Sequence, residues 1–133
     1  MNNVVAHFKD GRLLKGVTID FAPDKDHFRL SPESLSPAGG WPQEVQVGSL
    51  KALFFVKSLQ GDPLRSKSNQ ADPYHPLQGK KIQVVFKDGE ILVGTTQTYQ
   101  PGRPGLFLVP VDPESNNEQC YVVANATKQI SLL

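Results

Sequence analysis

The sequence predicts an all-β protein made of two tandem five-stranded units, and three observations lead to that prediction. A nine-residue phrase occurs twice, as FKDGRLLKG at 8–16 and as FKDGEILVG at 86–94, 78 positions later. Between 4–21 and 82–99, 7 of 18 positions are identical, which indicates an internal repeat. Short segments of alternating polarity recur between turn residues, and no segment keeps a helical period for more than one turn.

The first unit opens with a strand and a hairpin. Residues 2–8 follow a period of two that is typical of a half-buried strand. Asp10-Gly11 predicts a tight turn, because glycine accepts the positive φ that a reversing chain needs. The returning strand is predicted at 12–21, and Gly16 inside it indicates a bulge or a sharp bend.

The other elements follow the same logic in both units. In the first unit we predict a turn at 22–26, strands at 27–30, 44–47 and 52–56, a proline-rich loop at 31–43 and one helical turn at 48–51. In the second unit we predict strands at 82–86, 91–99, 106–109, 119–123 and 129–133, with one helical turn at 125–127.

An irregular connection separates the units. Its residues show no periodicity and include three X-Pro pairs, which is typical of a linker or a functional loop. The predicted organisation is a first unit at 1–58, a linker at 59–79 and a second unit at 80–133.

Each unit has about 55 residues, a size at which a lone hydrophobic core is marginal. We therefore expect the units to pack on each other or on a second chain, which leaves a homodimer open. The candidates for that contact are apolar residues of the second strand of each unit that point away from its own core: Leu13, Val17, Ile19, Ile91 and Val93.

Composition restricts the class of protein. The formal net charge is +1, which disfavours broad electrostatic binding to nucleic acid or to an anionic membrane. The single cysteine, Cys120, excludes an internal disulfide and fits a reducing compartment. No signal peptide and no apolar run long enough to span a bilayer is recognisable, so we expect a cytoplasmic protein without a membrane partner.

Residues 8–12 (FKDGR), with Gly16 and Phe21, resemble the first sequence motif of Sm-like proteins. The second copy, with Gly94 and Tyr99, resembles it less closely. The resemblance implies that each unit is a small, strongly bent barrel of the SH3-like type, so that two tandem SH3-like (Sm-like) barrels are joined by an irregular linker. The chain also resembles uncharacterised bacterial proteins with a duplicated FKDG phrase.

The RNA site of Sm-like proteins does not carry over to this chain. Ala22-Pro23 and Gln100-Pro101 stand where those proteins place an RNA-contacting Asp and Asn. Their second motif is not recognisable at 47–51, and the helix that precedes their barrel is missing. The resemblance therefore implies the barrel and not the RNA contact.

Catalytic and metal-binding patterns are weak. No serine lies in a GxSxG elbow, and Cys120 has no obvious base beside it, so we favour a packed thiol and predict no enzyme. The run 24–27 (DKDH) lacks the further ligands of a calcium or zinc site and is interpreted as a solvated turn. PGRPG at 101–105 is interpreted as a rigid turn, the alternative being backbone amides that face an anion. No metal and no cofactor is predicted.

Two kinds of binding remain. Lys25, His27 and Arg29 lie in or beside one loop near Phe21, and basic and aromatic residues together are the elements of single-strand nucleic-acid binding. Aspartates at 20, 24 and 26 weaken the field of this cluster, so we favour a solvated surface there.

The loop aromatics Trp41 and Tyr74 are candidate anchors for a protein partner, or they pack back on the domain. The leading hypothesis is a non-catalytic protein-interaction or regulatory module with an unidentified protein partner. The alternative is a single-stranded nucleic-acid-binding protein that uses the loop around Lys25, His27 and Arg29.

Overall fold

The computed structural model describes residues 2–32, 42–58, 79–97, 99–100, 102–111 and 116–133. Within these ranges the chain is all-β, with ten strands, two short 3-10 turns and no α-helix. The strands are β1 (Asn2–Phe8), β2 (Leu13–Thr18), β3 (His27–Pro32), β4 (Gln43–Gln46), β5 (Leu50–Val56), β6 (Lys80–Phe86), β7 (Ile91–Thr96), β8 (Gly105–Pro110), β9 (Asn117–Val123) and β10 (Thr127–Leu132). The all-β prediction is thus confirmed.

The 3-10 turns lie close to the predicted helical turns. They are η1 (Val47–Ser49), which joins β4 to β5, and η2 (Ala124–Ala126), which joins β9 to β10. The strand β2 ends three residues before the predicted end at Phe21. The chain leaves the sheet there because Phe21 packs inward against other aromatic rings.

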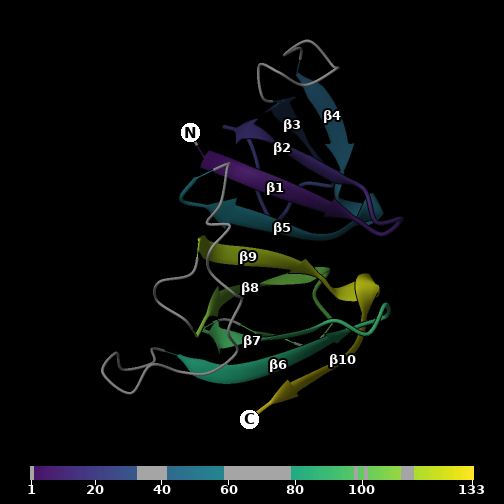
Figure 1. Cartoon of the computed structure of the whole chain (residues 1–133). Coiled ribbons are helices and arrows are strands. Elements are labelled where there is room, and N and C mark those ends of the chain that lie inside the picture. Colours follow the sequence, from purple (N-terminus) through teal and green to yellow (C-terminus); the bar gives the residue numbers. More distant parts are fainter. Residues whose placement is uncertain (1, 33–41, 59–78, 98, 101, 112–115) are drawn as a thin grey trace.

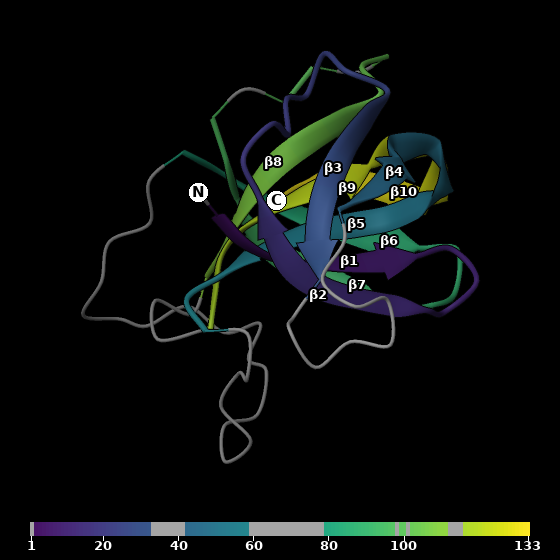
Figure 2. The same ribbon diagram turned by 90° about the horizontal axis from the view of Figure 1, so that it is seen from above.

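The strands form one antiparallel sheet in the order β10-β6-β7-β8-β9-β5-β1-β2-β3-β4 (Figure 1). The N-terminal half, β1–β5, and the C-terminal half, β6–β10, contribute their strands in the same relative order. The halves are stacked with β5 and β9 at the middle, and in the view down the stack their strands overlie one another (Figure 2).

Among the described strands the sheet is open, and its edges are β4 and β10. It therefore does not confirm the two closed barrels that the sequence predicted. The N-terminal half stays open because β5 pairs with β1 on one side and with β9 of the other half on its other side. β5 therefore has no edge left for another strand of its own half.

The β5–β9 pairing is the seam between the halves. It is antiparallel and runs from Ala52 opposite Val122 to Val56 opposite Asn117. Alternate residues of each strand enter opposite cores, since successive side chains of a strand point to opposite faces. Ala52 and Phe54 join the core of the C-terminal half, whereas Tyr121 joins the core of the N-terminal half.

The halves therefore pack on each other, but not through the residues predicted for that contact. The side chains of Leu13, Ile19 and Ile91 are 56%, 80% and 46% exposed. Val17 is only half-buried, and Val93 is buried but belongs to neither core cluster. The expected face-to-face contact is wrong, because β5 and β9 join edge to edge and bury both of their own faces instead.

Candidate interaction groove at the seam

An aromatic cluster fills the seam on the side of the N-terminal core. Phe21 is at its centre, with its ring centroid 5.2 Å from that of Phe28, 5.7 Å from Phe55 and 5.3 Å from Tyr121. The Phe107 ring lies 5.1 Å from Tyr121 and 6.3 Å from Phe21. All five of these pairs are edge-to-face, the arrangement that the aromatic quadrupole favours.

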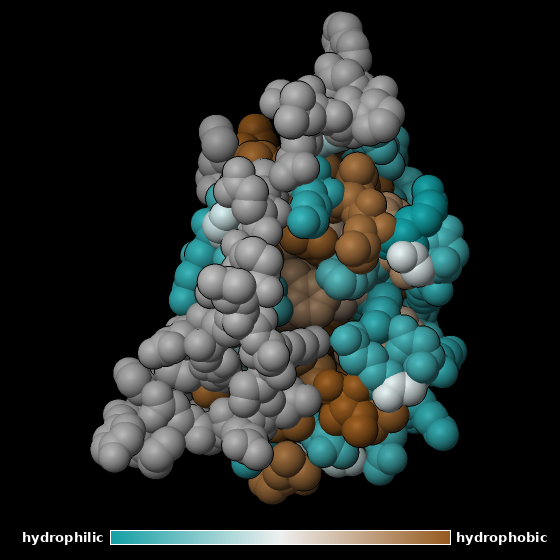
Figure 3. Space-filling model, in the orientation of Figure 1, coloured by the Kyte–Doolittle hydropathy of each residue, from teal (hydrophilic) through white to brown (hydrophobic). Residues whose placement is uncertain are grey.

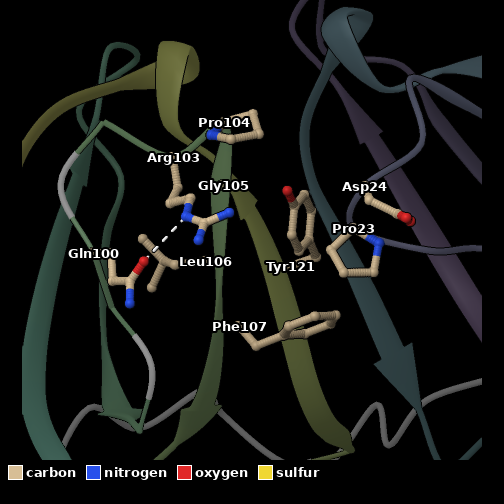
Figure 4. Close-up of a pocket in the computed structure, with 9 residues that line it drawn as sticks. All are labelled: Pro23, Asp24, Gln100, Arg103, Pro104, Gly105, Leu106, Phe107 and Tyr121. Carbon is tan, nitrogen blue, oxygen red and sulfur yellow. Dashed lines mark hydrogen bonds between the residues drawn. The ribbon is translucent and has the colours of Figure 1, made fainter.

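A groove of about 340 Å³ opens above this cluster, between the halves. Its floor is formed by β8 and β9, through Leu106, Phe107 and Tyr121. Pro23 and Asp24 of the β2–β3 turn form one wall, and Gln100, Arg103 and Pro104 of the β7–β8 connection form the other (Figure 4). The groove thus joins an apolar, aromatic floor to walls of opposite charge, and each half supplies one wall.

Gly105 determines the place of the Tyr121 ring. A Cβ atom at position 105 would come within 2.5 Å of the Tyr121 hydroxyl oxygen, so any side chain there would displace the ring. Burial raises the pKa of Tyr121, because the phenolate loses hydration in this site. The phenol therefore stays neutral at physiological pH and presents a hydroxyl that can donate or accept a hydrogen bond.

Gln100 orients the side chain of Arg103. Its Nε donates a hydrogen bond of 3.1 Å to Gln100 Oε1, which orients the guanidinium toward the groove (Figure 4). No carboxylate in the described part of the chain forms an ion pair with it. An exposed guanidinium with this orientation can bind a carboxylate or a carbonyl of a ligand.

The basic residues predicted from the sequence lie together elsewhere. Lys25, His27 and Arg29 line a shallow pocket of about 490 Å³, which they share with Asp20, Asp24 and Asp26. The neighbouring aspartates are engaged locally. Asp26 Oδ1 lies 2.7 Å from His27 Nδ1, and this hydrogen bond lowers the pKa of Asp26.

Asp20 is also engaged by the same loop. It accepts the backbone N–H of Arg29 at 3.0 Å, which is the main cause of its lowered pKa, and the Thr18 hydroxyl at 3.3 Å. The three basic residues are therefore interleaved with three aspartates, which offset their positive charge.

Phe21, predicted to stand beside these bases, does not line their pocket. It is the centre of the aromatic cluster at the seam instead. Trp41 and Tyr74 lie outside the described residues. The sequence analysis missed Phe107, Tyr121 and Arg103 as site residues, although Arg103 lies in the PGRPG turn that it singled out as rigid.

Other classes of site are reported for the described ranges only. Within them, no three His, Cys, Asp or Glu side chains gather as a metal site. The same ranges contain no helix long and apolar enough to cross a membrane.

Comparison with known proteins gives one match. A search of the curated proteins and a search of the solved structures find no similar protein. A family model described as a family of unknown function (DUF6982) matches residues 1–133, which is the whole chain given. The chain therefore belongs to the DUF6982 family.

Proposed function

We propose that this protein is a non-catalytic interaction module that binds an extended segment of a partner protein in the seam groove. The observation that carries the proposal is the composition of the groove. Its aromatic floor offers apolar area for one or two side chains, and its opposite walls carry one cation and one anion. Pockets with an apolar lining and a few placed polar groups are the usual form of a binding site.

An extended peptide suits this groove better than a compact ligand does. The groove is open along the seam, with prolines on both walls and rigid aromatic rings at its floor. Rigid aromatic surfaces lose little conformational entropy on binding, and aromatic-lined grooves are one of the common peptide-recognition modes. Arg103 would then bind a carboxylate or a carbonyl of the partner beside the side chain that fills the floor.

We also infer that the two halves are tandem SH3-like units derived by duplication. The repeated FKDG hairpin, the shared strand order and a 3-10 turn before the last strand of each half support this inference. A bacterial, cytoplasmic protein remains part of the proposal. Its support is the bacterial resemblance of the FKDG phrase and the single, fully buried thiol of Cys120.

The nucleic-acid alternative has one supporting observation, the shared pocket of Lys25, His27 and Arg29. Against it stand the three aspartates in the same pocket and the net charge of +1. We therefore rank peptide binding first and use the alternative as an outcome of the test.

The test is selection of a displayed random peptide library against the intact protein, followed by titration of the selected peptides. Arg103→Ala and Phe107→Ala should each weaken binding by about tenfold or more, since truncating a central anchor costs about 1–2 kcal/mol or more. The matched control for Arg103 is Arg12→Ala, because Arg12 is also exposed and lies in the β1–β2 hairpin, outside the groove.

Thermal unfolding of each variant separates lost binding from lost folding. Selected peptides that bind wild type and Arg103→Ala equally would contradict the proposal. Salt-sensitive retention of single-stranded RNA or DNA, lost in the Lys25→Ala/Arg29→Ala double variant, would favour the alternative.

A further inference from the structure

The outer edge of β10 is unpaired. β10 bonds to β6 on one side and has no strand on the other in the described part of the chain. The backbone N–H of Leu133 donates to the Lys81 carbonyl of β6 at 2.9 Å. Since N–H groups alternate along an antiparallel strand, the amides of Ile130 and Leu132 point away from β6, toward the open edge.

This edge is both basic and apolar. Lys80, Lys81 and Lys128 are exposed, and no described carboxylate forms an ion pair with any of them. No Asp or Glu occurs within 79–87 or 119–133. Leu132 and Leu133 are 52% and 63% exposed, and Figure 3 shows apolar surface over the region where Figure 1 places β6 and β10.

The seam between the halves shows what the corresponding edge of the N-terminal half binds. β5 has the same place in the order of its half as β10, and its outer edge accepts β9 as an antiparallel strand. Lys51, the second residue after η1, forms ion pairs of 2.8 Å with Asp88 and 2.6 Å with Glu90 across that seam. Lys128 is the second residue after η2 and is the counterpart of Lys51.

We propose that the outer edge of β10 is a second binding site, which takes an extended segment of another protein as an antiparallel eleventh strand. The segment alternates apolar and acidic residues. Its backbone pairs with the outward amides of Ile130 and Leu132, and its carboxylates face Lys128 and the lysines of β6.

A second copy of this chain fits the edge poorly. The edge strand that a second copy would offer is β4. Glu44 and Gln46 stand three residues and one residue before η1, and on β9 Tyr121 and Val123 stand at the same distances before η2. The apolar residues that fill the seam are thus replaced by polar ones. Asp10 and Arg12 stand in the first hairpin where Asp88 and Glu90 stand in the second. Because Arg12 forms an ion pair of 2.7 Å with Asp10, a second copy would offer Lys128 a neutralised pair in place of two carboxylates.

The test uses the full chain and a fluorescein-labelled, N-acetylated heptapeptide of alternating Val and Glu, with binding measured by anisotropy. Leu132→Pro removes one outward N–H without removing a bond to β6, and should weaken binding by about tenfold or more. Its matched control, Leu132→Ala, keeps the N–H and should change binding by less than about threefold. The same peptide with Lys in place of Glu should bind the wild type at least about tenfold more weakly.

A second measurement keeps the proposal testable if Leu132→Pro does not fold. The Val-Glu peptide, N-methylated at alternate residues on its edge-facing side, should lose binding to the unaltered protein. Equal binding by Leu132→Pro and Leu132→Ala, by the Lys and Glu peptides, or by the N-methylated peptide would overturn the proposal. Self-association of the peptide-free chain in sedimentation velocity, lost in Leu132→Pro, would assign the edge to a second copy and overturn it as well.

Discussion

At the scale of single residues, three glycines are required by space rather than by a turn. A Cβ atom at Gly16 would collide with the Ser31 carbonyl oxygen, and one at Gly94 with the Val109 carbonyl oxygen and the Leu108 side chain. Both positions lie where the second strand of a half begins to pair with the third. Gly105 has the same role under the Tyr121 ring. These glycines allow the close approaches on which the bend of each half and the groove depend.

Gly94→Ala should therefore destabilise the protein by about 1–3 kcal/mol, because the neighbouring β8 backbone must shift to admit a methyl group. The measurement is the free energy of unfolding in urea. Gly48→Ala is the matched control, since a Cβ atom there would meet no atom within 4 Å, and it should change stability by less than about 0.5 kcal/mol. Equal stability of the two variants would refute the close-approach explanation.

At the scale of elements, Lys51 of β5 forms ion pairs with Asp88 and Glu90 in the β6–β7 hairpin of the other half. Its side chain is 14% exposed, and Nζ lies 4.7 Å from the centre of the Phe86 ring. Burial by itself lowers the pKa of Lys51, but hydrogen bonds from Nζ to Asp88 and Glu90 outweigh it and raise the pKa above its ordinary value. The same bond from Lys51, followed by that from the Glu90 backbone N–H, lowers the pKa of Asp88.

Lys51→Met should destabilise the protein by about 1 kcal/mol or less near neutral pH, because the side chains of Asp88 and Glu90 are 56% and 39% exposed and water screens their charge. The raised pKa of Lys51 gives stability that is present below 10.5 and lost as the pH rises through the folded value. The lowered pKa of Asp88 gives stability that is present above 3.8 and lost as the pH falls through its folded value.

The difference between wild type and Lys51→Met should thus be largest from about pH 5 to pH 9 and shrink at both extremes. Urea unfolding across this range measures it. Lys128→Met is the matched control, since Lys128 forms no ion pair within the described residues, and it should show no such profile. A constant difference at all pH values would contradict the ion-pair explanation.

At the scale of the whole molecule, neither half has a complete core of its own. The core of the N-terminal half includes Tyr121 and Val123, and the core of the C-terminal half includes Val5, Phe54 and Val56. Because the cores share β5 and β9, the halves should fold as one cooperative unit.

Residues 1–58 alone should not fold cooperatively, because Phe54 and Val56 would be exposed and Tyr121 would be lost. Circular dichroism and urea unfolding of this fragment check the prediction, with the full chain, expected to unfold in a single transition, as the control. Mixing fragments 1–58 and 80–133 should restore a cooperative transition. A cooperatively folded monomer of 1–58 would contradict the shared-core interpretation.

The sequence by itself determined the all-β class and all ten strands, because period-two patterns and Asp-Gly turns act over a few residues. It also indicated that the halves need each other, since about 55 residues bury too little apolar area. The apolar run 52–56 was predicted as a buried strand, and β5 is indeed buried on both faces.

Only the tertiary structure decided which surfaces meet. The sequence analysis placed the contact between the halves on residues that include Leu13, Ile19 and Ile91, which are exposed. It placed Phe21 beside the candidate nucleic-acid-binding loop. Strand order and register are long-range properties: they decide that β5 meets β9, that Phe21 turns inward and that Arg103 and Asp24 line the same groove. None of these pairings leaves a local pattern in the chain, because each joins residues more than 30 positions apart in the sequence.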